Sequence, residues 1–143
     1  MKLFPATRPL EYIAMDILGP LPRTKHGRRF ISVITDRFTK LTKTESLRTI
    51  TSLSVAKAFC QCGVFNYGIP KVLLTDNGSQ FTSGFFRNVC RILGINKVFT
   101  TEYHPQTNGQ AERYNRTLLA ALRNFVSDSQ RDWDEWLGPV TYA

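Results

Sequence analysis

Short apolar segments separated by turns predict a β-sheet in the first third of the chain. YIAMDIL (12–18) and FISVITD (30–36) are rich in apolar and β-branched residues, which is typical of strands. The polar turn at residues 25–27 lies between them and favours an antiparallel pairing. The more polar segment TKTESL (42–47) predicts a third strand that suits the edge of a sheet.

Helices alternate with strands in the rest of the chain. One helix is expected from a cap at Thr51 to Gly68, and Pro70 follows it. The uninterrupted apolar segment KVLLT (71–75) predicts a strand covered on both faces, and NKVFT (96–100) predicts a fifth strand. This order of elements indicates an α/β fold with a mixed five-stranded sheet flanked by helices.

Three further helices are expected. Ser83 can cap a short helix that ends at Gly94. The polar stretch TEYHPQTNGQ (101–110) contains Pro and Gly and is expected to be a loop. A long helix should follow from about Asn108, and DWDEWLGPVTYA (132–143) should begin the last one.

The long helix is expected to have one apolar face. At about 100° per residue, its core face should carry Ala111, Tyr114, Leu118, Ala121, Leu122 and Phe125. Glu112, Arg116 and Arg123 should cluster on the side away from that face. Glu112 therefore lies outside the expected core, in the first turn, where the helix dipole alone favours an acid.

The charge balance changes the picture of a plain α/β domain. With 143 residues the chain suits one domain, and its 42% apolar and 21% charged residues exclude disorder. Nineteen Lys and Arg against eleven Asp and Glu leave a net charge of +8. A basic domain of this kind suits a polyanionic partner such as nucleic acid, although a solvated surface is the alternative. No apolar run reaches the length of a membrane span.

The cysteines point to a reducing compartment and to buried thiols. The three cysteines, Cys60, Cys62 and Cys90, are odd in number and follow no disulfide framework. With His26 and His104 as the only histidines and no Cys-x-x-Cys pair, a structural zinc site is not expected. We therefore expect the thiols to act as small hydrophobic side chains.

Two acids occur where strand-like apolar sequence is otherwise uninterrupted. Asp16 lies inside the first predicted strand, and Asp76 ends the fourth. Asp76-Asn77-Gly78 is also a turn signal, and turn chemistry alone explains an acid there. However, strand ends are where α/β sheets build their sites, so Asp16 and Asp76 are expected to converge.

Three converging carboxylates would suit divalent metal ions. With Glu112 as the third acid, the cluster would repel itself unless cations compensated the charge. Mg²⁺ binds carboxylate oxygens, and two such ions can stabilise the attacking and leaving oxygens of a phosphoryl displacement. Exposed arginines on the same helix would then meet a phosphate backbone.

Four motifs together resemble the catalytic core of a retroviral-type integrase, closest to integrases of gypsy-type LTR retrotransposons. They are MDILGPLP, VITDRFTK, GIPKVLLTDNGSQFTS and YHPQTNGQAERYNRTLLAALR, and 35 residues separate Asp76 from Glu112. The similarity runs from about Pro9 to Ala143 and covers nearly the whole chain. It implies an RNase H-like fold across residues 1–143.

The resemblance implies roles for individual residues. Asp16, Asp76 and Glu112 match the family's catalytic triad, which holds two Mg²⁺ or Mn²⁺ ions while 3′ ends of the element's DNA are trimmed and joined to target DNA. Asn77, Gly78 and Gly109 would support the site. The residues expected to contact DNA are Tyr103, Gln106, Asn108, Gln110, Arg113, Asn115, Arg116 and Arg123.

The resemblance also implies partners and a context. We expect double-stranded DNA, both element ends and target, and a homodimer or higher oligomer, in the nucleus of a cell and away from membranes. The family's N-terminal zinc module and C-terminal DNA-binding module are not expected in this chain, and the core itself is expected to be truncated at VTYA. Two alternatives are a domesticated, non-catalytic integrase-like module that binds DNA or protein, and an RNase H-like nuclease.

Other residues invite functional interpretations that we consider weaker. His104 suits loop shaping or DNA contact better than general base catalysis, because a two-metal mechanism needs no such base. Asp36 is expected to cap a turn, or to pair with Arg37 or Lys40, rather than to bind metal. Trp133 and Trp136 are expected to pack or to lie at a subunit interface rather than to stack on bases.

Overall fold

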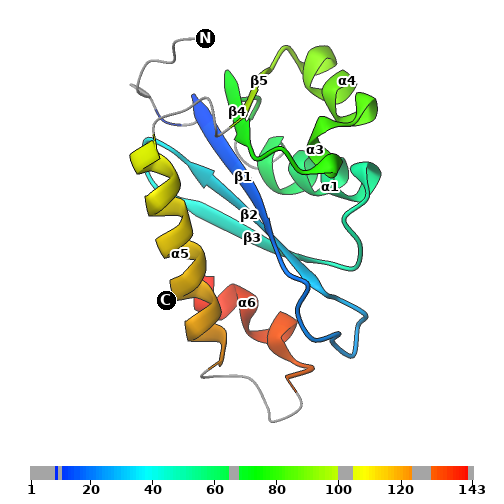
Figure 1. The fold of residues 1–143 in the computed structure, drawn as a ribbon, viewed down its shortest axis with the longest axis vertical. Coiled ribbons are helices and arrows are strands. Elements are labelled where there is room, and N and C mark those ends of the chain that lie inside the picture. Colours follow the sequence, from blue (N-terminus) through cyan, green and yellow to red (C-terminus); the bar gives the residue numbers. More distant parts are fainter. Residues whose placement is uncertain (1–8, 10, 65–67, 100–104, 124–129, 142–143) are drawn as a thin grey trace.

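The structure is a computed structural model that describes residues 9, 11–64, 68–99, 105–123 and 130–141, with backbone alone over 105–112. Its centre is a five-stranded sheet in the order β3-β2-β1-β4-β5 (Figure 1). The strands are β1 (Tyr12–Leu18), β2 (Phe30–Asp36), β3 (Thr42–Leu47), β4 (Val72–Thr75) and β5 (Asn96–Phe99). The mixed sheet predicted from the sequence is confirmed.

Strand direction changes at β1. The pairs β1–β2 and β2–β3 are antiparallel, whereas β1–β4 and β4–β5 are parallel. The polar strand β3 lies at one edge, as predicted. Because β1 and β4 are central and parallel, their carboxyl ends open at the same end of the sheet, where α/β folds place their sites.

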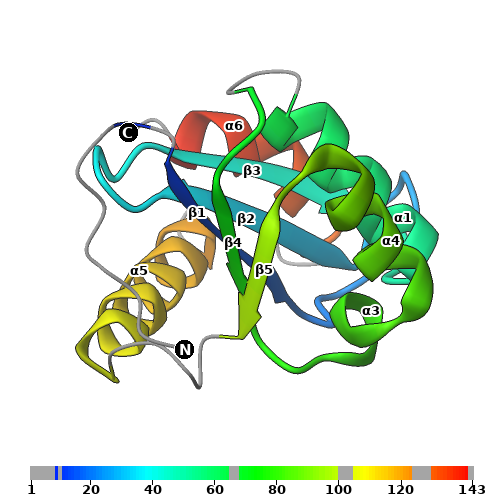
Figure 2. The ribbon, with the colours of Figure 1, turned by 90° about the horizontal axis from the view of Figure 1, so that it is seen from above.

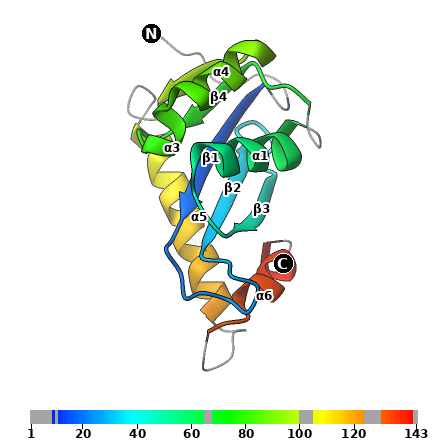
Figure 3. The same cartoon turned by 90° about the vertical axis from the view of Figure 1, so that its right-hand side faces the viewer.

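Helices cover both faces of the sheet (Figures 2 and 3). One face carries α1 (Ser52–Ala58), the π-helix η1 (Phe59–Val64), α3 (Ser79–Thr82) and α4 (Gly84–Leu93). The other face carries α5 (Pro105–Arg123), and α6 (Trp133–Thr141) packs against its C-terminal half (Figure 1). No helix among the described residues is both long enough and apolar enough to cross a membrane.

Two apolar clusters hold these layers together. Ile13, Met15 and Ile34 belong to the cluster under α1, η1, α3 and α4, where Phe81 and Phe86 meet edge to face with ring centroids 5.4 Å apart. The second cluster joins the opposite face of the sheet to α5 and α6 through Ile31, Val33, Leu118, Leu122, Trp133 and Leu137. Burial of these side chains supplies the main driving force for folding.

The helix boundaries confirm some predictions and correct others. Thr51 and Ser83 cap their helices, accepting hydrogen bonds from the backbone N–H groups of Ser54 and Phe86, and Gly94 ends α4 at φ +73°. The predicted helix after Thr51 widens into η1 after Ala58, instead of continuing as one regular helix. The short helix α3 was not predicted.

The expected loop at 101–110 is partly wrong, because α5 begins at Pro105. Proline fits the first position of a helix, where its missing N–H costs nothing. Gly109 costs only about 1 kcal/mol relative to alanine inside a helix. That penalty is too small to break a helix of 19 residues whose later turns pack on the sheet.

Candidate functional site

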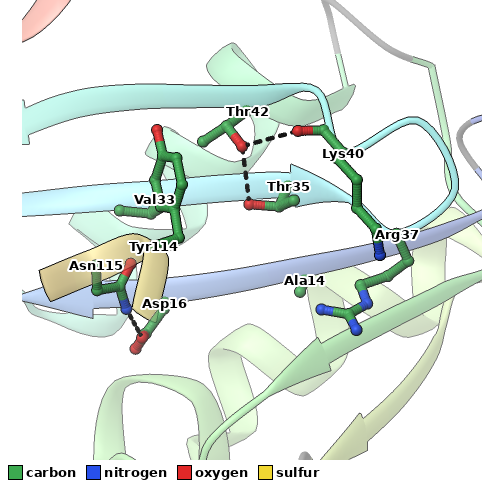
Figure 4. A pocket seen from close by; sticks show the side chains of 9 residues that line it. All are labelled: Ala14, Asp16, Val33, Thr35, Arg37, Lys40, Thr42, Tyr114 and Asn115. Carbon is green, nitrogen blue, oxygen red and sulfur yellow. Dashed lines mark hydrogen bonds between the residues drawn. The ribbon is translucent and has the colours of Figure 1, made fainter. Parts of the chain in front are cut away.

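Asp16 is held on the face of β1 that lies under α5. Its neighbours Met15 and Ile17 pack toward the opposite face, in the cluster beneath α1 and α4, and side chains alternate along a strand. Asp16 Oδ1 accepts a 2.8 Å hydrogen bond from the backbone N–H of Ile17. Asp16 Oδ2 accepts one of 2.8 Å from Asn115 Nδ2 on α5 (Figure 4). The carboxylate is therefore fixed from both the sheet and the helix.

Asp76 follows directly after β4, the parallel neighbour of β1. The ladder pairs Tyr12 with Val72 and Ala14 with Leu74. The ladder ends at this last pair; extended by two residues on each strand, its register would set Asp76 opposite Asp16, at the same end of the sheet. The register of the two central strands is consistent with the expected convergence of the two acids, which stays a prediction.

The turn after Asp76 orients its carboxylate. Asp76 is exposed, and its Oδ1 accepts a 2.8 Å hydrogen bond from the backbone N–H of Gly78. Gly78 has φ −57°, so the turn does not require glycine for its backbone angles. A Cβ on Gly78 would lie 3.0 Å from Asp76 Oδ1 and 2.7 Å from Gln80 Nε2. A Cβ at position 78 would therefore crowd the Asp76 carboxylate and require the Gln80 side chain to move.

Glu112 belongs to α5, one turn before Asn115. Positions three apart on a helix share a face, so the backbone of Glu112 lies next to the turn that contacts Asp16. Its side chain lies outside the described part of the chain. Among the side chains that the structure describes, no three His, Cys, Asp or Glu residues gather closely enough to hold a metal ion.

A pocket of about 120 Å³ extends from Asp16 across the face of the sheet (Figure 4). It is lined by Ala14, Asp16, Val33, Thr35, Arg37, Lys40, Thr42, Tyr114 and Asn115. Asp16 and Asn115 lie at one end, and Arg37 and Lys40 at the other (Figure 4). We expected Arg37 and Lys40 only as partners of Asp36. They belong to the connection between β2 and β3, and no local pattern indicated that they line a pocket with Asp16.

The predicted DNA-contacting residues divide into three groups. Arg113, Arg116 and Arg123 are exposed on α5, and Asn115 contacts Asp16 instead of facing solvent. Gln106, Asn108, Gly109 and Gln110 lie in the helical backbone of α5, and their side chains are outside the described residues. Tyr103 and His104 lie outside the described residues altogether.

Asp36 lies on the other side of the sheet from Asp16. It pairs with Ile13, whose side chain belongs to the cluster beneath α1. Its carboxylate accepts hydrogen bonds from the backbone N–H groups of Phe38 and Thr39 and from Thr39 Oγ1, at 3.2, 3.3 and 2.7 Å. The predicted turn cap is confirmed.

Trp133 and the cysteines have structural roles, whereas Trp136 is exposed and its expected packing or interface role stays a prediction. Trp133 is buried, and its Nε1 donates a 2.7 Å hydrogen bond to the carbonyl of Pro22, which confirms a packing role. All three cysteines are free, and Cys90 is buried. Cys62, however, donates a 2.7 Å hydrogen bond to Glu45 Oε2, so it is more than a small hydrophobic side chain.

Sequence comparison relates the chain to transposon polyproteins. Residues 6–105 match the integrase core domain family. The chain is 30% identical over 133 residues to the retrovirus-related Pol polyprotein from transposon 412 of Drosophila melanogaster, covering 93% of the chain and 11% of the polyprotein. It is 32% identical over 137 residues to the transposon Tf2-3 polyprotein of Schizosaccharomyces pombe, a match that covers 95% of the chain and 10% of that polyprotein. The chain thus spans about a tenth of the length of these relatives.

Solved structures share the fold. The BIV integrase catalytic core domain has a TM-score of 0.69 at 25% identity and covers 92% of this chain and 81% of that one. The HTLV-2 integrase catalytic core domain in complex with magnesium, in its dimeric form, has a TM-score of 0.75 at 20% identity, covering 95% and 86%. A simian T-cell lymphotropic virus intasome in complex with the PP2A regulatory subunit B56 gamma has a TM-score of 0.80 at 22% identity. The match covers 99% of this chain and 50% of that one.

These likenesses confirm the RNase H-like fold and the resemblance drawn from the four motifs. The family match covers more than half of the chain. The two transposon relatives extend the similarity over nearly all of it. The chain therefore belongs to the integrase core domain family, with relatives among retrotransposon Pol polyproteins.

Proposed function

We propose that this chain is the catalytic core of a retroelement integrase, which trims the 3′ ends of the element's DNA and joins them to target DNA. The observation that carries the proposal is the parallel pairing of β1 with β4, whose register, extended by two residues, favours a meeting of Asp16 and Asp76 at the carboxyl end of the sheet. The hydrogen bond from Asn115 adds support, because it connects this pair to the helix that bears Glu112.

The donor set at this site suits a hard divalent cation such as Mg²⁺ or Mn²⁺. Two carboxylates that meet at this end of the sheet would repel each other, and a bound cation would remove that penalty. Carboxylate oxygens are also the ligands that Mg²⁺ prefers. We infer that Asp16 and Asp76 hold the metal, and we propose Glu112 as the third ligand and a stoichiometry of two ions.

The chain's own residues would hold the metal and place the DNA. When bound, the ions would neutralise the phosphate's charge and lower the pKa of the attacking water or 3′-hydroxyl. Asn115 fixes the orientation of the Asp16 carboxylate through Oδ2, and Gly78 does the same for Asp76 through its N–H. The exposed Arg113 and Arg116 supply positive charge along α5 for the phosphate backbone.

The partners follow from the same proposal. They are double-stranded DNA, as element ends and target, and further copies of this chain, acting in the nucleus. The HTLV-2 core was solved in dimeric and trimeric forms, which supports self-association by analogy. The net charge of +8 favours association with DNA and makes it sensitive to salt.

A joining assay tests the proposal. The chain is incubated with Mg²⁺ or Mn²⁺, a pre-trimmed duplex that represents the element's end, and a target duplex, and the products are separated on a denaturing gel. Joined strands that disappear in Asp16→Asn support the integrase assignment. Cleavage without joining would assign a nuclease instead. If neither occurs and calorimetry detects no metal binding, the chain is a non-catalytic module.

A further inference from the structure

The pocket that begins at Asp16 ends in two basic side chains. Arg37 and Lys40 come from the connection between β2 and β3 and line the same pocket as Asp16 and Asn115 (Figure 4). The Lys40 side chain points toward Arg37 (Figure 4). One pocket therefore has an acidic end and a basic end, joined along one face of the sheet.

The connection that carries these two cations is braced by its own hydrogen bonds. The Asp36 carboxylate accepts three hydrogen bonds from Phe38 and Thr39. Thr42 Oγ1 donates a 3.2 Å hydrogen bond to the carbonyl oxygen of Lys40. It also forms a 3.3 Å hydrogen bond with Thr35 Oγ1. Lys40 itself has φ +67°, a left-handed conformation that is rare for a lysine. A strained residue held in place by its surroundings is typical of a functional site.

Holding the two cations together has an electrostatic cost. Burial and, next, the charge of Arg37 lower the pKa of Lys40, while Asp36 raises it. An anion between Arg37 and Lys40 would offset both the desolvation and the repulsion. The small side chain of Ala14 leaves space beneath them, and the hydroxyl groups of Thr35 and Thr42 line the wall. Basic side chains of this kind donate charge-assisted hydrogen bonds to phosphate oxygens.

We propose that Arg37 and Lys40 bind a phosphate of the same DNA strand whose reacting phosphodiester lies at Asp16. This inference rests on the proposed function and assigns a second contact point on the strand. The acidic end, with the metal ions proposed above, would bind the reacting phosphate, and Arg37 and Lys40 would bind a neighbouring phosphate. The strand then follows the pocket across β1 and β2, which orients the scissile bond relative to Asp16.

Lys40→Asn is the most informative variant. Asparagine removes the charge but tolerates the left-handed conformation of residue 40, so the backbone is preserved. Lys40→Arg keeps the charge. Lys57→Gln removes one charge from α1, on the opposite face of the sheet, and serves as the matched control. Thermal melts of all four proteins confirm that each is folded.

The measurement is binding of a fluorescein-labelled DNA duplex by anisotropy at a series of salt concentrations. Each phosphate contact contributes about 0.9 to the slope of log K against log salt. We expect Lys40→Asn to reduce that slope by about 0.9, and Lys40→Arg and Lys57→Gln to leave it unchanged. An unchanged slope in Lys40→Asn, or an equal loss in Lys57→Gln, would overturn the inference.

The two proposals fail separately. If the wild-type chain joins DNA in an Asp16-dependent way while Lys40→Asn keeps the wild-type slope, only the phosphate contact is wrong. If the wild-type chain joins no DNA, the enzymatic proposal is wrong whatever the slope of Lys40→Asn.

Discussion

Asn115 on α5 donates a 2.8 Å hydrogen bond to Asp16 on β1, across 99 positions of sequence. The bond connects the sheet to the helix that carries Glu112 one turn earlier. A carboxylate held in this way has one orientation before any metal or DNA arrives. The hydrogen bond thus joins the two parts of the proposed site that come from distant regions of the chain.

Removing this bond should weaken the site without unfolding the protein. We expect Asn115→Ala to lower Mg²⁺ affinity and joining activity by about 10- to 100-fold, the usual cost of losing a partner that orients a metal ligand. Titration calorimetry with Mg²⁺ and the joining assay measure the two effects. Thr117→Ala, at an exposed position of the same helix, should change neither.

Asp76→Asn should abolish strand transfer with Mn²⁺ and leave the fold intact. The asparagine Oδ1 can still accept the hydrogen bond from Gly78, so the turn is kept while the charge is lost. Circular dichroism melts and the joining assay check the two halves of this prediction. Wild-type rates of joining in this variant would show that Asp76 is not a metal ligand.

Gly78→Ala should affect activity more than stability. Its φ of −57° suits alanine, so the free energy of unfolding should change by less than about 1 kcal/mol. However, the new Cβ would lie 3.0 Å from Asp76 Oδ1, and the carboxylate must shift by a few tenths of an ångström. We expect roughly a tenfold loss of joining activity, because small displacements of catalytic groups are costly. Urea unfolding and the joining assay separate the two effects, and an activity equal to wild type would contradict the prediction.

Cys62 should be a poorly reactive thiol. Burial raises the pKa of Cys62 most, followed by the hydrogen bond to Glu45 and the negative charge of Glu45. Together they bring this pKa to about 12, although the positive charge of Lys43 lowers it. At pH 8 its alkylation should be roughly 1000-fold slower than that of an ordinary thiol with a pKa near 9, since the thiolate reacts. Glu45→Gln should lower this pKa and speed alkylation several-fold. Peptide mass spectrometry after iodoacetamide treatment measures Cys62, with a short unstructured cysteine peptide as the reference, because burial also raises the pKa of Cys90 to about 11.

The same shift has a consequence for stability. The protonated thiol is favoured in the folded state, while the unfolded thiol ionises from about its ordinary value of 9.0. The stabilising contribution of the Cys62 thiol to the free energy of unfolding is therefore fully present below pH 9 and is lost as the pH rises toward 12. Urea unfolding at rising pH should show a smaller loss in Glu45→Gln than in the wild type.

Local patterns predicted the elements because those patterns act over a few residues. The bounds of β1, β2 and β3 match the predicted segments. Thr51 and Ser83 cap their helices because their hydroxyl oxygens can accept hydrogen bonds from backbone N–H groups of the first turn. The predictions that failed concern helix boundaries. The helix after Thr51 widens after Ala58, and α5 begins at Pro105, where proline suits the first turn and Gly109 costs too little to delay the start.

The candidate site was only partly visible in the sequence. Asp16 and Asp76 could be selected because an acid in an apolar strand, or at its end, is unusual. Three other features could not be predicted from the sequence. They are the register of β1 and β4, the hydrogen bond from Asn115, and the pocket that joins Asp16 to Arg37 and Lys40. They depend on how strands pair and where α5 crosses the sheet.

The sequence by itself therefore determined the strands, the helices, the two acids and the basic charge, because side-chain periodicity and composition are local properties. The tertiary structure alone decided which side chains meet. The parallel pairing of β1 with β4 sets Asp76 at the end of the strand next to that of Asp16, and the docking of α5 brings Asn115 onto Asp16. Both arise from burial of two separate apolar clusters on the two faces of the sheet, which no local pattern encodes.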